Sequence, residues 1–422
     1  MNELLIDKSI IKQVKHSTIK KKVKVARNKR LITKTIIQKS LQVILVSTLA
    51  FPLFPAGCSN KSTTLYLAYD ERTRNKGFIN SSGKWAIQPQ HMYALPFSEG
   101  YALVVIGKGS EAEDVFINQK GKVAIKPEGI PVGGFSNGLA LALSRDSETY
   151  LYGYLNTKGK WAIEPQYTAA IGFSNGYAII SFDGFTWMTI DQSGKTIAQI
   201  PGANMLAYPV TKDGTFAMAG YDSITRTFDL RGNLIHEASY YNEHAQFNEG
   251  LAAVKDKRNG LVGFIDKNSD WVIAAQFSKA YGFSEGYSAA QDPESGKWGY
   301  IDLKGNWVIQ PCFENCSSFE NALAFAQSET TGTWGVINKS GEWVVSPFTE
   351  MIHPHELANY TIKEMGLHNS IATDILTWYG PYLGVFNGDL ALIVVPDGDH
   401  SLEYRYIDKK GRTVYSWVFK YK

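Results

Sequence analysis

The stretch WGYIDLKGNWVIQP at residues 298–311 returns, with substitutions, along most of this 422-residue chain. Clear copies are GFINSSGKWAIQP at 77–89 and GYLNTKGKWAIEP at 153–165. A register glycine marks the copies at Gly83, Gly121, Gly159, Gly194, Gly232, Gly305, Gly341 and Gly411, with Ser269 in its place once. Self-similarity at a period of about 36 residues is typical of a repeat array. One such unit cannot bury its aromatic face alone, so we expect neighbouring units to stack.

An asparagine or aspartate lies three residues before the register position in all nine copies. These residues are Asn80, Asn118, Asn156, Asp191, Asp229, Asp266, Asp302, Asn338 and Asp408. The side chain of such a residue accepts a backbone N–H two residues later, and glycine adopts the positive φ that closes the turn. We therefore interpret these acids as hairpin turns and not as catalytic groups.

A strand pattern follows each turn. Tryptophan recurs two residues after the register position at Trp85, Trp161, Trp271, Trp307 and Trp343, and an aliphatic residue stands two further on. Period two places both side chains on one face of a strand. The proline that follows, as at Pro89 and Pro311, removes a ladder donor and ends the strand. The fold class predicted is all-β, a tandem array of about 36-residue units with short antiparallel strands. Either a propeller-like ring or an open, curved solenoid satisfies this pattern.

The copies resemble the WG-containing β repeats (KWG type) of bacterial proteins, which are named for Trp-Gly pairs such as Trp298-Gly299 and Trp334-Gly335. The resemblance covers about 77–347 and resumes from 386 to about 417. It implies an all-β array and leaves the ligand open. The copies around 186–243 have lost the tryptophan and proline, so we expect their packing to differ.

The amino-terminal segment has the composition of an export signal. Residues 1–40 carry twelve Lys and Arg against two acids, and the uncharged apolar run 41–54 follows. This run is too short for a mature membrane span, which needs about 20 residues. It ends at Pro55-Ala56-Gly57-Cys58, which resembles a bacterial lipobox, although Pro55 stands where that motif usually has an aliphatic residue. The resemblance implies that Cys58 carries acyl chains, palmitate among them, and anchors the protein on the extracytoplasmic face of the cell membrane. An ordinary secretory signal with a chance cysteine and an uncleaved anchor are the alternatives.

A nucleic-acid partner is not expected. The basic leader directly precedes an apolar run, as the positive-inside rule requires of an export signal. The rest of the chain holds 31 basic and 38 acidic residues, so it repels phosphate.

We divide the chain by these patterns. The predicted parts are a basic leader and lipoprotein signal peptide at 1–57, a tether at 58–76, WG-type β repeats at 77–348, an insertion in an enlarged repeat at 349–383, and terminal β repeats at 384–422.

Three motifs invite a chemical interpretation. The stretch GFSNG at 134–138 fits the nucleophile elbow Gly-x-Ser-x-Gly. It returns around Ser174 and Ser284, and an enzyme needs one nucleophile and not one per repeat, so we assign no catalytic residue. The insertion holds His353, His355 and His368 with Glu350 and Glu356, but at no recognised metal spacing, so we assign neither a metal nor a cofactor.

Cys312 and Cys316 form the third motif. An exported protein permits a disulfide, but a separation of four residues is bridged only if the chain folds back. A disulfide and two free thiols both remain open.

These observations predict a membrane-anchored surface lipoprotein that is not an enzyme and whose repeat array acts as a binding or scaffolding module. The partner expected is a protein or a cell-envelope glycan. The alternative is an envelope-polymer hydrolase with its site in the 349–383 insertion, where repeat arrays often place a binding face. A purely mechanical spacer is a third interpretation.

Overall fold

The computed structural model describes residues 64–107, 109–146, 150–200, 205–220, 222, 224–239, 246–352, 386–398 and 401–420. They belong to a compact unit that spans Ser47–Lys422. They form 32 strands and one 3-10 segment, Gly109–Glu111, with no α-helix among the described residues. The all-β prediction is confirmed.

Hydrogen bonding divides the strands into eight antiparallel sheets. The first four are β1 (Tyr66–Asp70), β2 (Asn75–Ile79) and β3 (Trp85–His91); β4 (Tyr101–Ile106), β5 (Glu113–Asn118) and β6 (Val123–Ile125); β7 (Ile130–Pro131), β8 (Leu139–Leu143), β9 (Tyr152–Asn156) and β10 (Trp161–Tyr167); and β11 (Ala169–Ala170), β12 (Tyr177–Ser181), β13 (Trp187–Asp191) and β14 (Thr196–Ile200).

The next two sheets are β15 (Met205–Ala207), β16 (Thr215–Gly220), β17 (Ile224–Asp229) and β18 (Leu234–Ser239); and β19 (Ala252–Lys255), β20 (Val262–Ile265) and β21 (Trp271–Phe277). The seven-stranded sheet holds β22 (Lys279–Ala280), β23 (Ser288–Gln291), β24 (Trp298–Ile301), β25 (Trp307–Cys316), β26 (Leu323–Ser328), β27 (Trp334–Asn338) and β28 (Trp343–Thr349). The last sheet is β29 (Phe386–Asn387), β30 (Leu390–Pro396), β31 (Ser401–Asp408) and β32 (Thr413–Lys420).

The seven-stranded sheet contains two repeats joined through β25, which pairs with β24 along its first part and with β26 at its end. The described strands therefore make nine repeats, numbered here 1 to 9 in chain order. Repeats 1 and 2 are the first two sheets, repeats 3 to 5 the three four-stranded sheets that follow, and repeat 6 is β19–β21. Repeat 7 runs from β22 into β25, repeat 8 from the end of β25 to β28, and repeat 9 is β29–β32.

Each repeat contains the predicted Asx turn between its last two strands. In repeat 3, Asn156 Oδ1 accepts the backbone N–H groups of Lys158 at 2.9 Å and Lys160 at 3.2 Å. The backbone N–H of Gly159 closes the turn on the Asn156 carbonyl at 2.9 Å, with a φ of 77° at the glycine. The other eight Asx residues accept the same pair of backbone N–H groups. The prediction that these acids form turns is confirmed.

The register residue of one repeat also touches the last strand of the preceding repeat. A Cβ added at Gly305 would lie 2.7 Å from Ile273 Cγ2, and one at Gly341 would lie 3.0 Å from the Cγ2 of Ile309. Where serine replaces the glycine, the Ser269 hydroxyl donates to the Ile235 carbonyl at 2.6 Å. The same position therefore closes a turn and joins two repeats.

The recurring tryptophans lie at these junctions as well. Trp307 meets the Phe277 ring edge-on at 5.4 Å, and Trp343 meets Phe313 at 5.7 Å. In both pairs the phenylalanine comes from the last strand of the preceding repeat. Stacking of repeats is thus carried by aromatic pairs in addition to the close approach at glycine.

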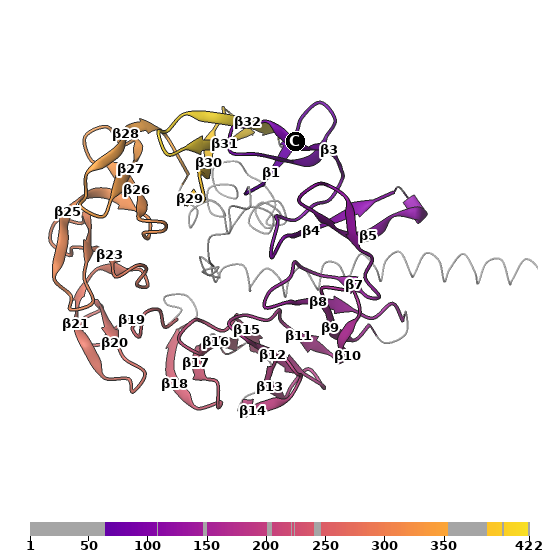
Figure 1. The fold of residues 1–422 in the computed structure, drawn as a ribbon. Coiled ribbons are helices and arrows are strands. Elements are labelled where there is room, and N and C mark those ends of the chain that lie inside the picture. The colour runs from indigo at the N-terminus through magenta and orange to yellow at the C-terminus, as the bar shows by residue number, and fades with distance from the viewer. Residues whose placement is uncertain are drawn as a thin grey trace, which may run out of the picture. The chain divides into compact units, whose positions relative to one another are not determined.

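The first and last repeats bind each other, so the array closes into a ring (Figure 1). The Tyr406 hydroxyl of β31 donates to the Leu67 carbonyl of β1 at 2.9 Å, and the Tyr415 hydroxyl of β32 donates to the Tyr69 carbonyl at 2.9 Å. A Cβ at Gly83 would collide with the Val414 carbonyl, as the register residue does at other junctions. Of the two predicted architectures, the structure has the propeller-like ring and not the open solenoid.

The tether predicted at 58–76 is wrong for its described part. β1 lies within this range, and Leu65, Leu67 and Ala68 are buried in a core shared with β30 and β31. The segment holds no Asx turn of its own, so the repeat pattern does not include it. It supplies the first strand of the ring. The insertion predicted at 349–383 is described only to Ile352, whose N–H donates to the Val394 carbonyl at 2.9 Å; residues 353–383 lie outside the described residues.

Candidate binding surface

A second family of hairpins leads into β4, β8, β12, β16, β19, β23, β26 and β30, the third strand from the end of each of repeats 2 to 9. It therefore lies at the same end of the antiparallel sheets as the Asx turn, which joins the last two strands. The tip of repeat 2 is closed by paired backbone hydrogen bonds between Ser98 and Tyr101. Its two central residues, Glu99 and Gly100, have φ values of 51° and 86°. Positive φ at both positions defines a type I′ turn, whose twist matches that of the strands. We call these tips the inner hairpins, and the inner hairpins and Asx turns together the turn face.

Hydrogen bonds connect the inner hairpins from one repeat to the next. Glu99 accepts the Gly138 N–H at 2.9 Å, and Asn137 accepts the Gly176 N–H at 2.9 Å. The same link joins Gly250 to Asp213, Gly286 to Glu249, and Ala322 to Glu285. Each acidic or amide tip is therefore held in place by its neighbour, and the turn face is preorganised before any partner arrives.

The serines of the Gly-x-Ser-x-Gly copies serve the same junctions. Ser174 donates its hydroxyl to the Val210 carbonyl at 2.8 Å, and Ser284 donates to the Phe319 carbonyl at 2.7 Å. Ser136 pairs through its backbone with Leu139, and the chain continues into β8 and not into a helix. The strand-to-helix context of a nucleophile elbow is absent from these three sites.

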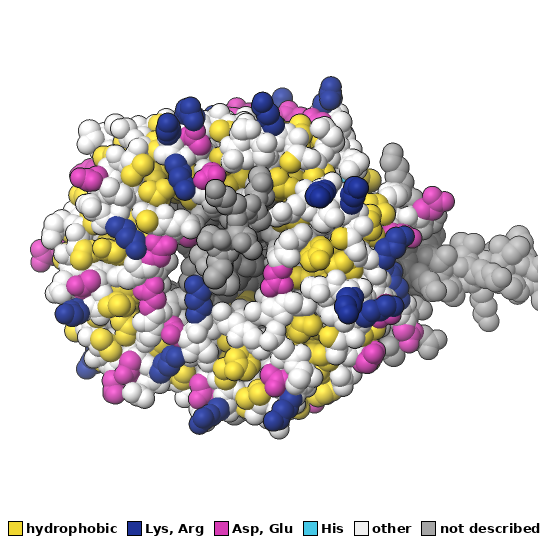
Figure 2. All heavy atoms as spheres, in the orientation of Figure 1, with side chains coloured by type: hydrophobic (Ala, Val, Ile, Leu, Met, Phe, Trp, Pro, Cys, Tyr) yellow, Lys and Arg dark blue, Asp and Glu magenta, His cyan; other side chains and the backbone are white. Residues whose placement is uncertain are grey.

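Charge on the turn face comes in two kinds. Acids occupy four inner hairpins, at Glu99, Asp213, Glu249 and Glu285. Exposed basic side chains occupy five Asx turns, two residues after the acid or amide: Lys120, Lys158, Arg231, Lys304 and Lys410. Figure 2 shows basic and acidic side chains interspersed around one face of the molecule. Lys339 joins the two kinds of hairpin, because its ammonium group lies 3.3 Å from a Glu285 carboxylate oxygen.

Glu320 has an unusual position in the inner hairpin of repeat 8, where four other repeats have serine (Ser98, Ser136, Ser174 and Ser284). Burial and the nearby Glu285 charge raise the pKa of Glu320 to about 7, and Lys212 acts in the opposite direction. This carboxyl group therefore changes its charge close to neutral pH.

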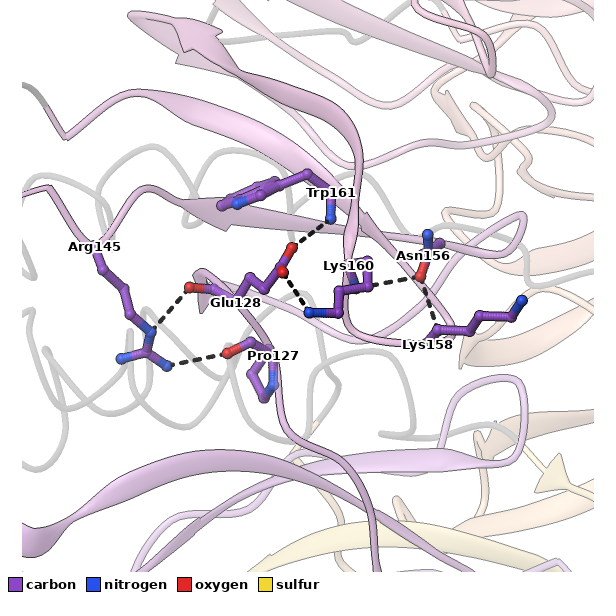
Figure 3. A network of polar contacts seen from close by, with 7 residues as sticks. All are labelled: Pro127, Glu128, Arg145, Asn156, Lys158, Lys160 and Trp161. Carbon is purple, nitrogen blue, oxygen red and sulfur yellow. Dashed lines mark hydrogen bonds and ion pairs between the residues drawn. The ribbon is translucent and has the colours of Figure 1, made fainter.

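A polar network fixes the junction of repeats 2 and 3 (Figure 3). The Glu128 carboxylate accepts hydrogen bonds from the Lys160 ammonium group at 2.5 Å and from the Trp161 backbone N–H at 3.1 Å. Arg145 donates to the backbone carbonyls of Glu128 and Pro127. These contacts lower the pKa of Glu128, with the hydrogen bond from Lys160 as the main cause. The network joins two repeats and does not converge on a cavity.

The structure contains Cys312 and Cys316 as free thiols, so the disulfide left open by the sequence is not formed in it. Both residues belong to β25, and four residues of extended strand span about 13 Å, beyond the reach of a disulfide. Cys316 is buried, which raises the pKa of its thiol to about 12, whereas Cys312 is exposed.

Several predicted site residues lie outside the described residues. They are Cys58, His353, His355, Glu356 and His368. Within the described ranges, no three His, Cys, Asp or Glu side chains gather as metal ligands would. The same ranges include no helix that could span a membrane.

Comparison with known families identifies the repeat. The family description "WG containing repeat" matches residues 77–109, 152–184, 263–292, 298–329 and 334–347. The chain carries WG repeats. The matched WG repeats include all three stretches with which the pattern was first recognised, so the predicted resemblance is confirmed. Comparison with curated proteins finds no match.

Solved structures resemble the ring of WG repeats in fold. A crystal structure of the eukaryotic initiation factor has a TM-score of 0.50 at 11% identity and covers 85% of this chain and 96% of its own. BamB from Moraxella catarrhalis has a TM-score of 0.31 at 11% identity and covers 56% of this chain and 79% of its own. The neighbours are β-propeller-like proteins, and a likeness at this identity concerns the fold alone.

Proposed function

We propose that the WG-repeat ring is a binding module for a protein partner, held on the outer side of the cell membrane by a lipid on Cys58. The observation that carries the proposal is the turn face, where the inner hairpins are fixed to one another from repeat to repeat and exposed basic side chains lie in five Asx turns. Charges of both signs at regular intervals favour a partner with a complementary charge pattern, because electrostatic complementarity sets both association rate and specificity.

A protein suits this surface better than a neutral glycan. Sugar rings stack on exposed aromatic faces. Trp298, Trp334 and Tyr300 are 4%, 2% and 0% exposed and serve the core, whereas the exposed Trp271 and Trp343, at 41% and 38%, begin the outer strands β21 and β28 and do not lie in the turns.

Capture from an envelope extract tests the proposal. The soluble form beginning at Ser59 is immobilised, and the bound protein is identified by mass spectrometry. The variant Lys158→Glu/Lys304→Glu reverses two Asx-turn charges and is expected to lose the partner. The matched control Arg72→Glu/Lys257→Glu reverses two exposed charges in loops at the other end of the sheets and is expected to retain it. Equal capture by both variants would contradict a role for the turn face.

The anchor has a separate test. Growth with an alkyne-labelled palmitate analogue is expected to label the wild-type chain and to leave Cys58→Ala unlabelled. An unlabelled wild-type chain would contradict lipidation and would favour an ordinary secretory signal or an uncleaved anchor.

A further inference from the structure

The described chain enters the ring at the turn face, beside repeat 9 (Figure 1). The first residue of β1, Tyr66, pairs with Ile79, which directly precedes the Asx turn of repeat 1. The Tyr66 hydroxyl donates to the Asn387 carbonyl at 2.9 Å, in the inner hairpin of repeat 9. Thr64 lies at the same hairpin, because a Cβ added at Gly388 would be 3.4 Å from the Thr64 Oγ1 atom. The chain before Thr64 therefore joins the ring at the turn face.

The covalent distance from this entry point to Cys58 is short. Cys58 stands six residues before Thr64. A fully extended chain spans at most about 3.3–3.6 Å per residue, so a lipid on Cys58 holds Thr64 within about 20 Å of the membrane surface. The hairpins at the opposite end of the sheets lie beyond the five residues of β1, about 17 Å further along the strand. The anchor therefore favours the turn face, and not the opposite end, as the side toward the bilayer.

Basic side chains are concentrated in the Asx turns around this entry point. We call the Asx turns of repeats 9, 1 and 2, which are residues 408–412, 80–84 and 118–122, the anchor sector. It holds six Lys and Arg against one acid, Asp408. The corresponding five-residue turns of repeats 3 to 8 hold seven Lys and Arg against six acids. The excess of positive charge therefore lies where the proposed anchor joins the ring.

Most of this positive charge is available to a partner. Arg412 pairs with Asp408 at 2.6 Å, and Lys409 lies 3.7 Å from an Asp389 carboxylate oxygen. The other four basic side chains of the anchor sector are exposed, and none of them forms an ion pair with a carboxylate of the described residues: Lys84, Lys120, Lys122 and Lys410. A surface of opposite charge can therefore approach these four ammonium groups directly.

We propose that the anchor sector binds the anionic phospholipid headgroups of the membrane that carries the Cys58 lipid. A basic patch is a common second signal beside an acyl anchor. Each lysine or arginine near an anionic bilayer strengthens binding severalfold. This inference rests on the lipid at Cys58 proposed above and deepens the proposed function, because it leaves the Asx turns of repeats 3 to 8 to the protein partner and places that partner at the membrane surface.

Co-sedimentation with lipid vesicles tests the proposal. The soluble form beginning at Ser59 contains the whole closed ring, from β1 to β32, and lacks both the basic leader and the lipid. It is expected to bind vesicles of equal parts phosphatidylglycerol and phosphatidylcholine at about 0.1 M salt, and to be released at about 0.5 M salt. Vesicles of phosphatidylcholine alone are expected to leave it in solution. Absence of binding to the anionic vesicles would overturn the proposal.

Charge reversal tests the location. Lys84→Glu/Lys120→Glu changes two turns of the anchor sector and is expected to weaken vesicle binding at least about tenfold. Lys195→Glu/Arg231→Glu changes the same two turn positions in repeats 4 and 5, so it alters the net charge equally and is expected to bind like the wild type. Equal weakening of both variants at unchanged unfolding temperature would show that net charge and not the anchor sector determines binding.

Hydrogen exchange on the anionic vesicles tests the orientation. Exchange is expected to slow at 80–84 and 118–122 and to stay unchanged at 292–297, a hairpin at the opposite end of the sheets. Slower exchange at 292–297 alone would place the other end on the membrane and overturn the proposal.

The vesicle assay and the capture assay fail independently. The vesicles contain no protein, so loss of vesicle binding leaves the protein partner in place. Lys158→Glu/Lys304→Glu lies outside the anchor sector and is expected to lose the protein partner while binding vesicles like the wild type.

Discussion

At the register position, two independent constraints select glycine. The residue needs a positive φ to close the Asx turn, and it must admit the side chain or backbone of the preceding repeat. Gly305 meets both, with a φ of 84° and a neighbouring Ile273 atom at 2.7 Å from an added Cβ. Gly296 meets only the first, since its φ is 69° and an added Cβ there would have nothing within 4 Å.

Mutation of Gly296 and of Gly305 to alanine separates the two constraints. Gly296→Ala is expected to lower the free energy of unfolding by about 1 kcal/mol, the strain of a left-handed alanine. Gly305→Ala carries the same strain and in addition displaces Ile273, so a loss of about 2–4 kcal/mol is expected. Urea unfolding measures both values. Equal losses would show that the junction contact contributes nothing.

Glu320 gives stability a pH dependence at the residue scale. Its folded-state pKa of about 7 lies above the ordinary value of 4.5, so the folded protein binds this proton more tightly than the unfolded chain does. Stability from this group therefore falls as pH rises from 4.5 to about 7, and the loss is complete above that.

Glu320→Gln removes this ionisation. The variant is expected to be more stable than the wild type at pH 8, by an amount on the order of 1 kcal/mol because solvent screens a half-buried group. At pH 4.5 the two proteins are expected to unfold alike. Urea unfolding at the two pH values checks this, and a difference that does not change with pH would contradict the role of the charge.

At the scale of elements, the aromatic pair is what holds one outer strand to the next. Trp307→Ala removes the partner of Phe277 at a junction where the tryptophan is half-buried. A loss of about 2 kcal/mol in the free energy of unfolding is expected, less than for a fully buried tryptophan. Val308→Ala, on the adjacent exposed position, is the control and is expected to change stability by less than about 0.5 kcal/mol.

A strand or turn could be predicted from the sequence where residues close in the chain determine it. Asx and glycine at fixed spacing determine a hairpin without help from distant residues, so all nine turns could be placed from sequence. β1 could not, because it has no register motif and pairs with β2 ahead of the repeat pattern, while its side chains pack against repeat 9. The hydrogen bonds of Ser174 and Ser284 across the junctions were also hidden, because they join residues 36 and 35 positions apart.

At the scale of the whole ring, closure is the contact that no single repeat provides. Tyr406 and Tyr415 of repeat 9 donate to backbone carbonyls of repeat 1. Tyr406→Phe/Tyr415→Phe is expected to lower the free energy of unfolding by about 1–3 kcal/mol, because two hydrogen bonds are lost. Hydrogen exchange is expected to accelerate in β1 and β31 together.

Tyr101→Phe removes a hydroxyl from repeat 2, away from the closing contact, and serves as the control. Faster exchange in β31 with β1 unchanged would mean that the two ends open independently and that the ring is not closed by these bonds.

Closure also orders events during synthesis. Leu67 is synthesised 339 residues before Tyr406, whose hydroxyl donates a hydrogen bond to the Leu67 carbonyl. For all that time the apolar face of β1 is uncovered, and such a nascent surface is prone to aggregation. If synthesis stopped before residue 401, β31 and β32 would be missing and the apolar side chains of β1 would stay exposed. A chaperone or protease that binds an exposed β1 would therefore act on chains whose synthesis stopped before repeat 9.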